Sequence, residues 1–434
     1  MKTPVDKSII DNAIQSVGIK DFEHITIFEM ASVAVMSEKQ SGVEFIRMEI
    51  GTPGLPSAEI GVNAQIAALQ NGVAQYYADI VGTPELKHET SRFIKAFLNV
   101  DVSPKGCVPT SGSMQGVYAS FLTCMQMKEN AHILFIDPGF PVQKMQCDVM
   151  GLPYYSFDVY NYRGAEKLEA KLEGYLKNDD VVAIVYSNPN NPTWVCLTEE
   201  ELQTIGHLAD KYDVVVIEDL AYFAMDFRSD LGQPFQPPYQ PTVARYTKNY
   251  ILHISGSKIF SYAGERIAMT CISDALYHRE YPLLEKKYKI GELGFVYVRR
   301  VLYVLTSGTG SSCQYALAAM LKASNDGMYD FRNKVAEYGR RATLLKKVFL
   351  KNGFKIIYDK DGEDSLADGF YFTIGYEGMT GGELAKKLLY FGVSTYPLLE
   401  TGSKQNGLRI CTSFIKNHHF DLLDERLKNF SKIN

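Results

Sequence analysis

Cysteine is scarce in this 434-residue sequence, and its seven cysteines are scattered without a Cys-x-x-Cys pair. An odd number of dispersed cysteines argues against a disulfide framework, and the absence of paired spacing leaves no zinc-binding pattern. We therefore expect no bound metal. Reduced cysteines of this kind are typical of packing residues in a cytoplasmic protein, and this is the location we expect.

The chain also lacks an excess of positive charge and any long apolar run. Its 45 Lys and Arg residues are outnumbered by 50 Asp and Glu residues, and the net charge of -5 provides no basic field for nucleic acid. No apolar run approaches a membrane-spanning length, and the N-terminal residues open no apolar signal core. We find no internal repeat. These absences favour a soluble globular protein with no nucleic-acid or membrane partner.

Short apolar runs alternate with helical patterns in the middle of the chain. Residues 133–136, 181–186 and 214–217 are nearly continuous in apolar residues. A helix between the last two is announced by a capping box, Thr198-x-x-Glu201. Strands of this type are buried on both faces, so the pattern predicts an α/β fold with a mostly parallel sheet covered by helices.

The last hundred residues change to a mixture of helices and separate short strands, such as 370–374 and 407–411. We therefore predict two domains. Residues 1–50 and 325–434 form a smaller α+β domain from the N- and C-terminal segments, and residues 51–324 form a large α/β domain that binds a cofactor.

Lys258 stands directly after a predicted strand, in the segment Ser255-Gly256-Ser257-Lys258, and Arg266 follows eight positions later. Ligands of α/β sheets bind at strand ends. A lysine beside hydroxyl groups and a second cation suits a Schiff base to a phosphorylated aldehyde, because burial and a nearby positive charge favour its neutral, nucleophilic form. Taken alone, however, such a segment is more often a solvated turn.

Two further strand ends carry the other groups that pyridoxal 5'-phosphate requires. Asp219 can keep the pyridine nitrogen protonated, and Asn191 and Tyr222 can donate to the ring oxygen. Phe140, after the strand at 133–136, can stack on the ring. The phosphate needs a helix N-terminus, hydroxyl groups and an arginine. The candidates for it are Ser113, the backbone of Met114, Ser255, Ser257 and Arg266.

Three motifs occur in one order along the chain: Asn188-Pro-Asn-Asn191-Pro-Thr, Asp219-x-x-Tyr222, and Ser255-x-Ser-Lys258 through Gly264-Glu-Arg266. In this combination the sequence resembles the fold-type I pyridoxal-phosphate aminotransferases, the aspartate aminotransferase superfamily. The resemblance implies a sheet of the seven-stranded type. It also implies transfer of the amino group of an amino acid to a 2-oxo acid by a ping-pong mechanism.

The resemblance further implies roles for single residues. Lys258, Asp219 and Tyr222 would be the catalytic residues, with Lys258 as the Schiff-base lysine. Arg409 would bind the substrate α-carboxylate, together with Asn191 and the backbone of Gly51. Tyr77 would reach the phosphate in a neighbouring subunit, so a homodimer is expected.

The sequence departs from the family pattern at three positions. Trp194, the only tryptophan, and Ser261 stand where glycine is common, and Gln143 stands where a tyrosine often follows the stacking aromatic. These departures affect which substrate side chain fits. A distal carboxylate on the substrate would need a second cation, for which Arg299 or Arg300 is a candidate.

Two alternative functions use the same residues. A C–S β-lyase, another eliminase or a decarboxylase also needs Lys258 and Asp219, although Arg409 argues against loss of the α-carboxylate. A non-catalytic regulatory module of the same fold would need a winged-helix DNA-binding segment, and we expect the 50 residues before Gly51 to be too few for one plus the usual small-domain helix.

Overall fold

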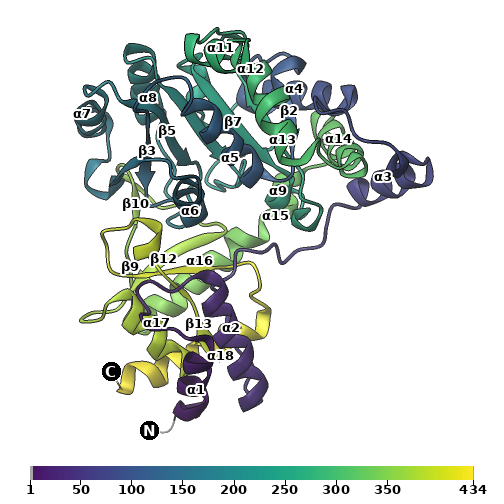
Figure 1. Ribbon diagram of the computed structural model, residues 1–434. Coiled ribbons are helices and arrows are strands. Elements are labelled where there is room, and N and C mark those ends of the chain that lie inside the picture. Colours follow the sequence, from purple (N-terminus) through teal and green to yellow (C-terminus); the bar gives the residue numbers. More distant parts are fainter. Residues whose placement is uncertain (1–2, 434) are drawn as a thin grey trace. The chain divides into compact units, whose positions relative to one another are not determined.

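The computed structural model describes residues 3–433 and divides into two compact units. The larger unit comprises Leu55–Pro189 and Cys196–Val335 (Figure 1). The smaller unit joins the N-terminal segment up to Gly54, the short loop Asn190–Val195 and the C-terminal segment from Ala336. The expected assignment of residues 1–50 with 325–434, and of 51–324, to two folding domains stays a prediction.

The larger unit is built on one seven-stranded sheet. Its strand order is β2-β8-β7-β6-β5-β3-β4. The strands are β2 (Cys107–Thr110), β3 (His132–Asp137), β4 (Tyr154–Asp158), β5 (Val181–Ser187), β6 (Val215–Leu220), β7 (Tyr250–Ser255) and β8 (Ala268–Ile272). β8 alone runs opposite to the other six strands, so its pairings with β2 and β7 are antiparallel. The predicted α/β class with a mostly parallel sheet is therefore confirmed.

Burial explains why these runs form strands. Every residue of β5, β6 and β7 is buried, as expected for parallel strands covered on both faces. The helices around this sheet include α5 (Ser113–Cys124), α6 (Pro141–Met150), α7 (Ala165–Leu176) and α8 (Glu199–Lys211). The capping box of α8 is present, because the Glu201 N–H donates to Thr198 Oγ1 at 3.2 Å and the Thr198 N–H donates to Glu201 Oε2 at 2.9 Å.

The remaining helices of the larger unit lie mostly in its last third. They are α3 (Glu59–Gln70), α4 (Pro84–Leu98), α9 (Gly256–Ile259), α10 (Asp274–Tyr277), α11 (Pro282–Tyr288), α12 (Leu293–Val296), α13 (Tyr303–Thr306), α14 (Ser311–Asn325) and α15 (Phe331–Val335), with a π-helix at Tyr297–Leu302. Between residues 3 and 433, no helix combines the length and the apolar character needed to cross a membrane.

The smaller unit has the α+β character that its sequence suggested. A four-stranded antiparallel sheet has the order β14-β15-β12-β9, and β1 pairs in parallel with β13. These strands are β1 (Ile46–Arg47), β9 (Lys355–Ile356), β12 (Tyr371–Gly375), β13 (Val393–Ser394), β14 (Tyr396–Pro397) and β15 (Leu408–Cys411), and β10 (Lys360–Asp361) pairs with β11 (Asp364–Ser365). The helices are α1 (Lys7–Val17), α2 (Ile27–Ser41), α16 (Glu337–Lys351), α17 (Gly381–Leu389) and α18 (Asn417–Ile433).

Candidate active site

Asp219 is a buried carboxylate near the carboxyl end of β6. It is 7% exposed, and it accepts hydrogen bonds from Gln143 Nε2 at 3.0 Å and from the Ala221 N–H at 3.1 Å. Burial raises the pKa of Asp219 to about 6, and these two hydrogen bonds only partly oppose the shift. Both donors are neutral, so a cationic N–H against this carboxylate would stabilise its charged form.

Lys258 lies one short turn beyond the neighbouring strand. β6 and β7 pair in parallel, with Leu220 opposite Ile254, so both strands end at the same edge of the sheet. β7 leads into α9, which contains Lys258. The turn is fixed by Ser255, whose buried Oγ accepts a hydrogen bond from the Ser257 N–H at 3.1 Å.

Arg266 lies beside the N-terminus of α5 in the larger unit. Ser113 is the first residue of α5, and its buried Oγ has no hydrogen-bond partner within residues 3–433. Gly112 precedes it at φ 77°, and a Cβ there would collide with the Arg266 guanidinium. The missing side chain thus lets Arg266 lie at the helix end, where free N–H groups and the helix dipole favour an anion. Met114 follows, and its carbonyl accepts from Gln146 Nε2 at 2.9 Å.

A buried histidine fixes α5 against the sheet. His253 on β7 contacts Thr270 Oγ1 at 3.1 Å through Nδ1 and Ser120 Oγ at 3.3 Å through Nε2. Burial lowers the pKa of His253 to about 3, so the ring is neutral. A Cβ on Gly116 would come within 2.7 Å of Nδ1, so glycine is what permits this close approach of helix and strand.

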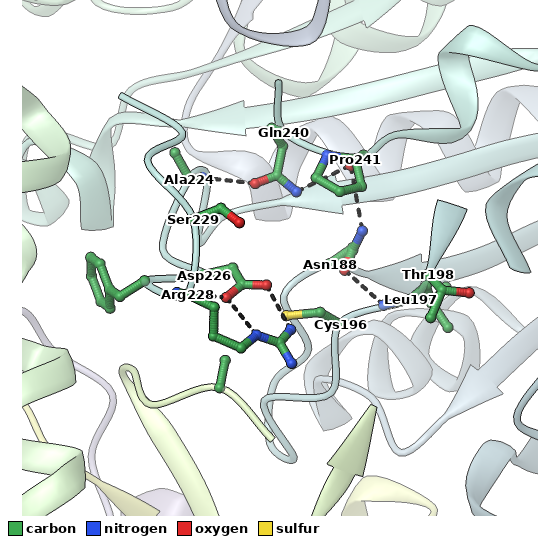
Figure 2. A network of polar contacts seen from close by, with 12 residues as sticks. Asn188, Cys196, Leu197, Thr198, Ala224, Asp226, Arg228, Ser229, Gln240 and Pro241 are labelled. Carbon is green, nitrogen blue, oxygen red and sulfur yellow. Dashed lines mark hydrogen bonds and ion pairs between the residues drawn. The ribbon is translucent and has the colours of Figure 1, made fainter. Parts of the chain in front are cut away.

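The loops after β5 and β6 are tied to one segment, as Figure 2 shows. Asn188 Oδ1 accepts from the Leu197 N–H at 3.2 Å, and its Nδ2 donates to the Pro241 carbonyl at 3.5 Å. Gln240 donates to the same carbonyl at 3.1 Å and accepts from the Ala224 N–H at 3.0 Å. The chain after Asp219 and the start of the asparagine loop are therefore held by a common anchor.

The other predicted residues of the larger unit differ in exposure. Tyr222 is buried beyond β6, and Phe140 is half-buried at the start of α6. Tyr77 is 95% exposed and lines a shallow groove with residues 306–312. Arg299 is exposed on the π-helix, whereas the Arg300 guanidinium stacks over the Phe295 ring at 5.1 Å.

Within the smaller unit, Arg409 on β15 is 1% exposed. Its Nη1 donates to Asn191 Oδ1 at 3.3 Å, and its Nη2 donates to the Glu49 carbonyl. The guanidinium lies over the rings of Tyr371 and Tyr396, at 4.8 and 5.1 Å from their centroids. A Cβ on Gly51 would collide with the Tyr371 hydroxyl. Arg409, Asn191 and Gly51 thus belong to one cluster.

Sequence reasoning missed several of these contacts. The sequence marks Gln143 only as a departure from the family pattern, yet its side chain donates to Asp219. The available signal is its position three residues after Phe140, on the first turn of α6. The departures Trp194 and Ser261 adopt φ values of 67° and 50°, which explains why glycine is common there. Nothing in the pattern of β7 distinguished His253.

Comparison with known proteins is consistent with this arrangement. Residues 45–418 match the family model described as aminotransferase class I and II. The chain belongs to the aminotransferase class I and II family. It is accordingly a pyridoxal-phosphate-dependent aminotransferase, and the predicted resemblance, enzyme class and cofactor are confirmed.

The individual proteins that match this aminotransferase have low sequence identity to it, but the matches cover most of both chains. A probable aspartate aminotransferase of Methanocaldococcus jannaschii is 24% identical over 363 residues, covering 83% of this chain and 86% of that protein. An asparagine–oxo-acid transaminase of Streptococcus mutans is 22% identical and covers 77% and 78%. The structure of an alanine aminotransferase from Pyrococcus furiosus superposes with a TM-score of 0.77 at 19% identity, covering 97% and 99%. This last likeness shows the shared fold.

The larger unit of this aminotransferase fits pyridoxal phosphate at two points. The buried Asp219 carboxylate has two neutral donors and a raised pKa, which matches a protonated pyridine nitrogen. The buried Ser113 Oγ, with no partner in the described chain, and the α5 N-terminus beside Arg266 match a phosphate group. Both fits rest on the chemistry of the groups that are present.

Proposed function

We propose that this aminotransferase moves the amino group of an amino acid to a 2-oxo acid by a ping-pong mechanism, with Lys258 holding the cofactor as a Schiff base. The observation that supports this most is Asp219, a buried carboxylate at the end of β6. The paired strand β7 leads directly into Lys258. A carboxylate and an amine at one sheet edge suit a ligand with a basic ring nitrogen and an aldehyde.

Pyridoxal phosphate, when bound, supplies an aldehyde that condenses with amines and a protonated ring that withdraws electrons from the substrate Cα. With the cofactor bound, Lys258 would be the amine that holds it and, after exchange with the amino group of the substrate, would be the base that moves the substrate Cα proton. Asp219 would hold the ring nitrogen of the bound cofactor in its protonated form. Gln143 keeps the Asp219 carboxylate oriented through its hydrogen bond to Oδ2.

Other residues hold the cofactor in place. Asn191 and Tyr222 would donate hydrogen bonds to the ring oxygen of the bound cofactor, and Phe140 would cover one face of its ring. The α5 N-terminus and nearby hydroxyl and guanidinium groups would bind the phosphate. These groups are Ser113, the Met114 N–H, Ser255, Ser257 and Arg266.

Arg409 binds the substrate α-carboxylate. Its Nη1 and Nη2 already have acceptors, while its Nε has no hydrogen-bond partner within the part of the chain that the structure describes. A buried guanidinium with an unused N–H is suited to a carboxylate. Gly51 borders this cluster, where a side chain would displace Tyr371.

We further propose a cytoplasmic homodimer in which Tyr77 reaches the phosphate of the neighbouring subunit. The side chains of Tyr76, Tyr77 and Val304 are at least 73% exposed. Exposure of large apolar side chains to water is unfavourable, and a subunit interface would bury them. The exposed Arg299 is the better candidate for a distal carboxylate, because the Arg300 guanidinium already packs on Phe295.

The substrate side chain is open to direct screening. Relatives are named for aspartate, asparagine and LL-diaminopimelate, so these amino acids are the first donors to test. An amino donor supplied alone should convert the cofactor to pyridoxamine phosphate, with loss of the imine absorbance band. With cysteine, whose sulfur can leave as hydrogen sulfide, release of pyruvate and ammonia in place of pyridoxamine phosphate would instead show β-elimination and overturn the proposal.

A further inference from the structure

Trp194 is the only tryptophan of the chain, and it is fully buried in the smaller unit. Its φ of 67° lies in the left-handed region that a bulky L-residue rarely adopts. Such a strained backbone persists only where the surrounding contacts hold it, and strain of this kind concentrates at functional sites. We propose that Trp194 is a positioning residue that orients Arg409 for the substrate carboxylate. The inference rests on the function proposed for Arg409.

The first route from Trp194 to Arg409 runs through Tyr371. The indole lies so close to Gly369 that a Cβ at that position would collide with its ring atoms. The indole meets the Tyr371 ring at a centroid distance of 6.3 Å and an interplanar angle of 67°. Tyr371 also packs against the Phe370 ring, and the Arg409 guanidinium lies 4.8 Å from the Tyr371 ring centroid. Trp194 thus limits where the Tyr371 ring can lie, and Tyr371 limits where Arg409 can lie.

The second route runs through the loop Asn190–Val195. The Trp194 N–H donates to the Asn190 carbonyl at 2.9 Å, and the Asn190 N–H donates to the Val195 carbonyl at 3.0 Å. This closed loop carries Asn191, whose Oδ1 accepts from Arg409 Nη1 at 3.3 Å. The backbone of Trp194 therefore closes the same loop that supplies a hydrogen-bond acceptor to the arginine.

The variant Trp194→Gly tests the contribution of the indole separately from that of the backbone. Glycine accepts a φ of 67° without strain, so the loop can keep its path while the contact with Tyr371 is lost. We expect the KM for the amino acid to rise about tenfold, the factor that loss of an aligned cation–π and aromatic pair would cause. We expect kcat to change by less than about threefold and the imine absorbance band to be retained, because the groups proposed to bind the cofactor stay in place.

Three controls separate positioning from a general packing defect. Trp194→Phe keeps an aromatic ring, so its KM for the amino acid should lie between the values of the wild type and of Trp194→Gly. In an Arg409→Leu background, Trp194→Phe should have no further effect, because the group that it positions is gone. The amide of the amino acid, which lacks the carboxylate, should bind the wild-type protein and the Trp194→Phe variant with affinities that agree within about twofold.

The unmodified protein provides a test that needs no variant of Trp194. Because it has one tryptophan, its indole emission reports this position alone. Titration of the cofactor-loaded enzyme with a 2-oxo acid that the wild type turns over should change the emission saturably, and Arg409→Leu should abolish the change at the same ligand concentrations. Emission that is insensitive to saturating oxo acid, or equal KM values for wild type and Trp194→Gly, would overturn the inference.

Failure of this inference is distinguishable from failure of the proposed function. If the wild-type enzyme shows no amino-acid-dependent loss of the imine band, the proposed function is wrong. If wild type turns over normally and the variants at position 194 match it, only the role of Trp194 is wrong.

Discussion

Replacing Asp219 by Asn should stabilise the cofactor-free protein at neutral pH while weakening cofactor binding. In the folded protein, burial against neutral donors raises the Asp219 pKa from 3.8 to about 6. A carboxyl group with a raised pKa binds its proton more tightly in the folded than in the unfolded chain. Its contribution to stability is therefore present below pH 4 and is lost as the pH rises through 6.

The size of this loss follows from the pKa shift. A difference of about two units corresponds to about 3 kcal/mol at pH 8, where the folded carboxylate is fully charged, and to about 1.5 kcal/mol at pH 5. The asparagine amide carries no charge, so the apo variant avoids this loss. We expect apo Asp219→Asn to be more stable than apo wild type by about 3 kcal/mol at pH 8 and by about half as much at pH 5.

Urea unfolding of both apo proteins, followed by circular dichroism at pH 5 and pH 8, measures this difference. Addition of pyridoxal phosphate should reverse the order at pH 8, because the ring nitrogen stabilises the carboxylate of the wild type alone. The neighbouring buried Glu218, whose pKa burial also raises, to about 7, provides the control. Glu218→Gln should not change cofactor affinity. An apo Asp219→Asn protein that is less stable than wild type at pH 8 would refute this reasoning.

Three further substitutions address separate parts of the site. Lys258→Ala should abolish the imine absorbance and turnover, and substantial transaminase activity in that variant would show that Lys258 is not the Schiff-base residue. Gly112→Ala would force Arg266 away from the α5 N-terminus and should weaken cofactor affinity at least about tenfold by equilibrium dialysis. Gly264→Ala, with open space around its Cβ, is the matched control, and equal affinities would argue against the phosphate role. Gly51→Ala would displace the Tyr371 hydroxyl. It should therefore raise the KM for the amino acid about tenfold and leave the cofactor affinity unchanged. An unchanged KM would contradict the role proposed for Gly51.

The strand-end residues could be found from the sequence because each follows an apolar run. Parallel strands end at one sheet edge, so the runs before Asp219 and Lys258 were enough to bring them to neighbouring positions. The alternation of apolar strands and helices predicted the sheet for the same physical reason.

Contacts between side chains that are distant in sequence could not be found in this way. Gln143 and Asp219 are 76 positions apart, and no spacing rule connects them. The rings around Arg409 come from β12 and β14, and their approach depends on the register of an antiparallel sheet with short strands. The burial of Trp194 likewise depends on Gly369, which no local pattern relates to the asparagine loop.

Reduction of the cofactor-loaded protein with borohydride, followed by peptide mass spectrometry, tests the central proposal most directly. The reagent converts the imine to a stable secondary amine and so marks the lysine that carries the cofactor. We predict the phosphopyridoxyl group on the peptide containing Lys258 and on no other. A label on a different lysine, or the absence of any label in protein saturated with pyridoxal phosphate, would contradict the account.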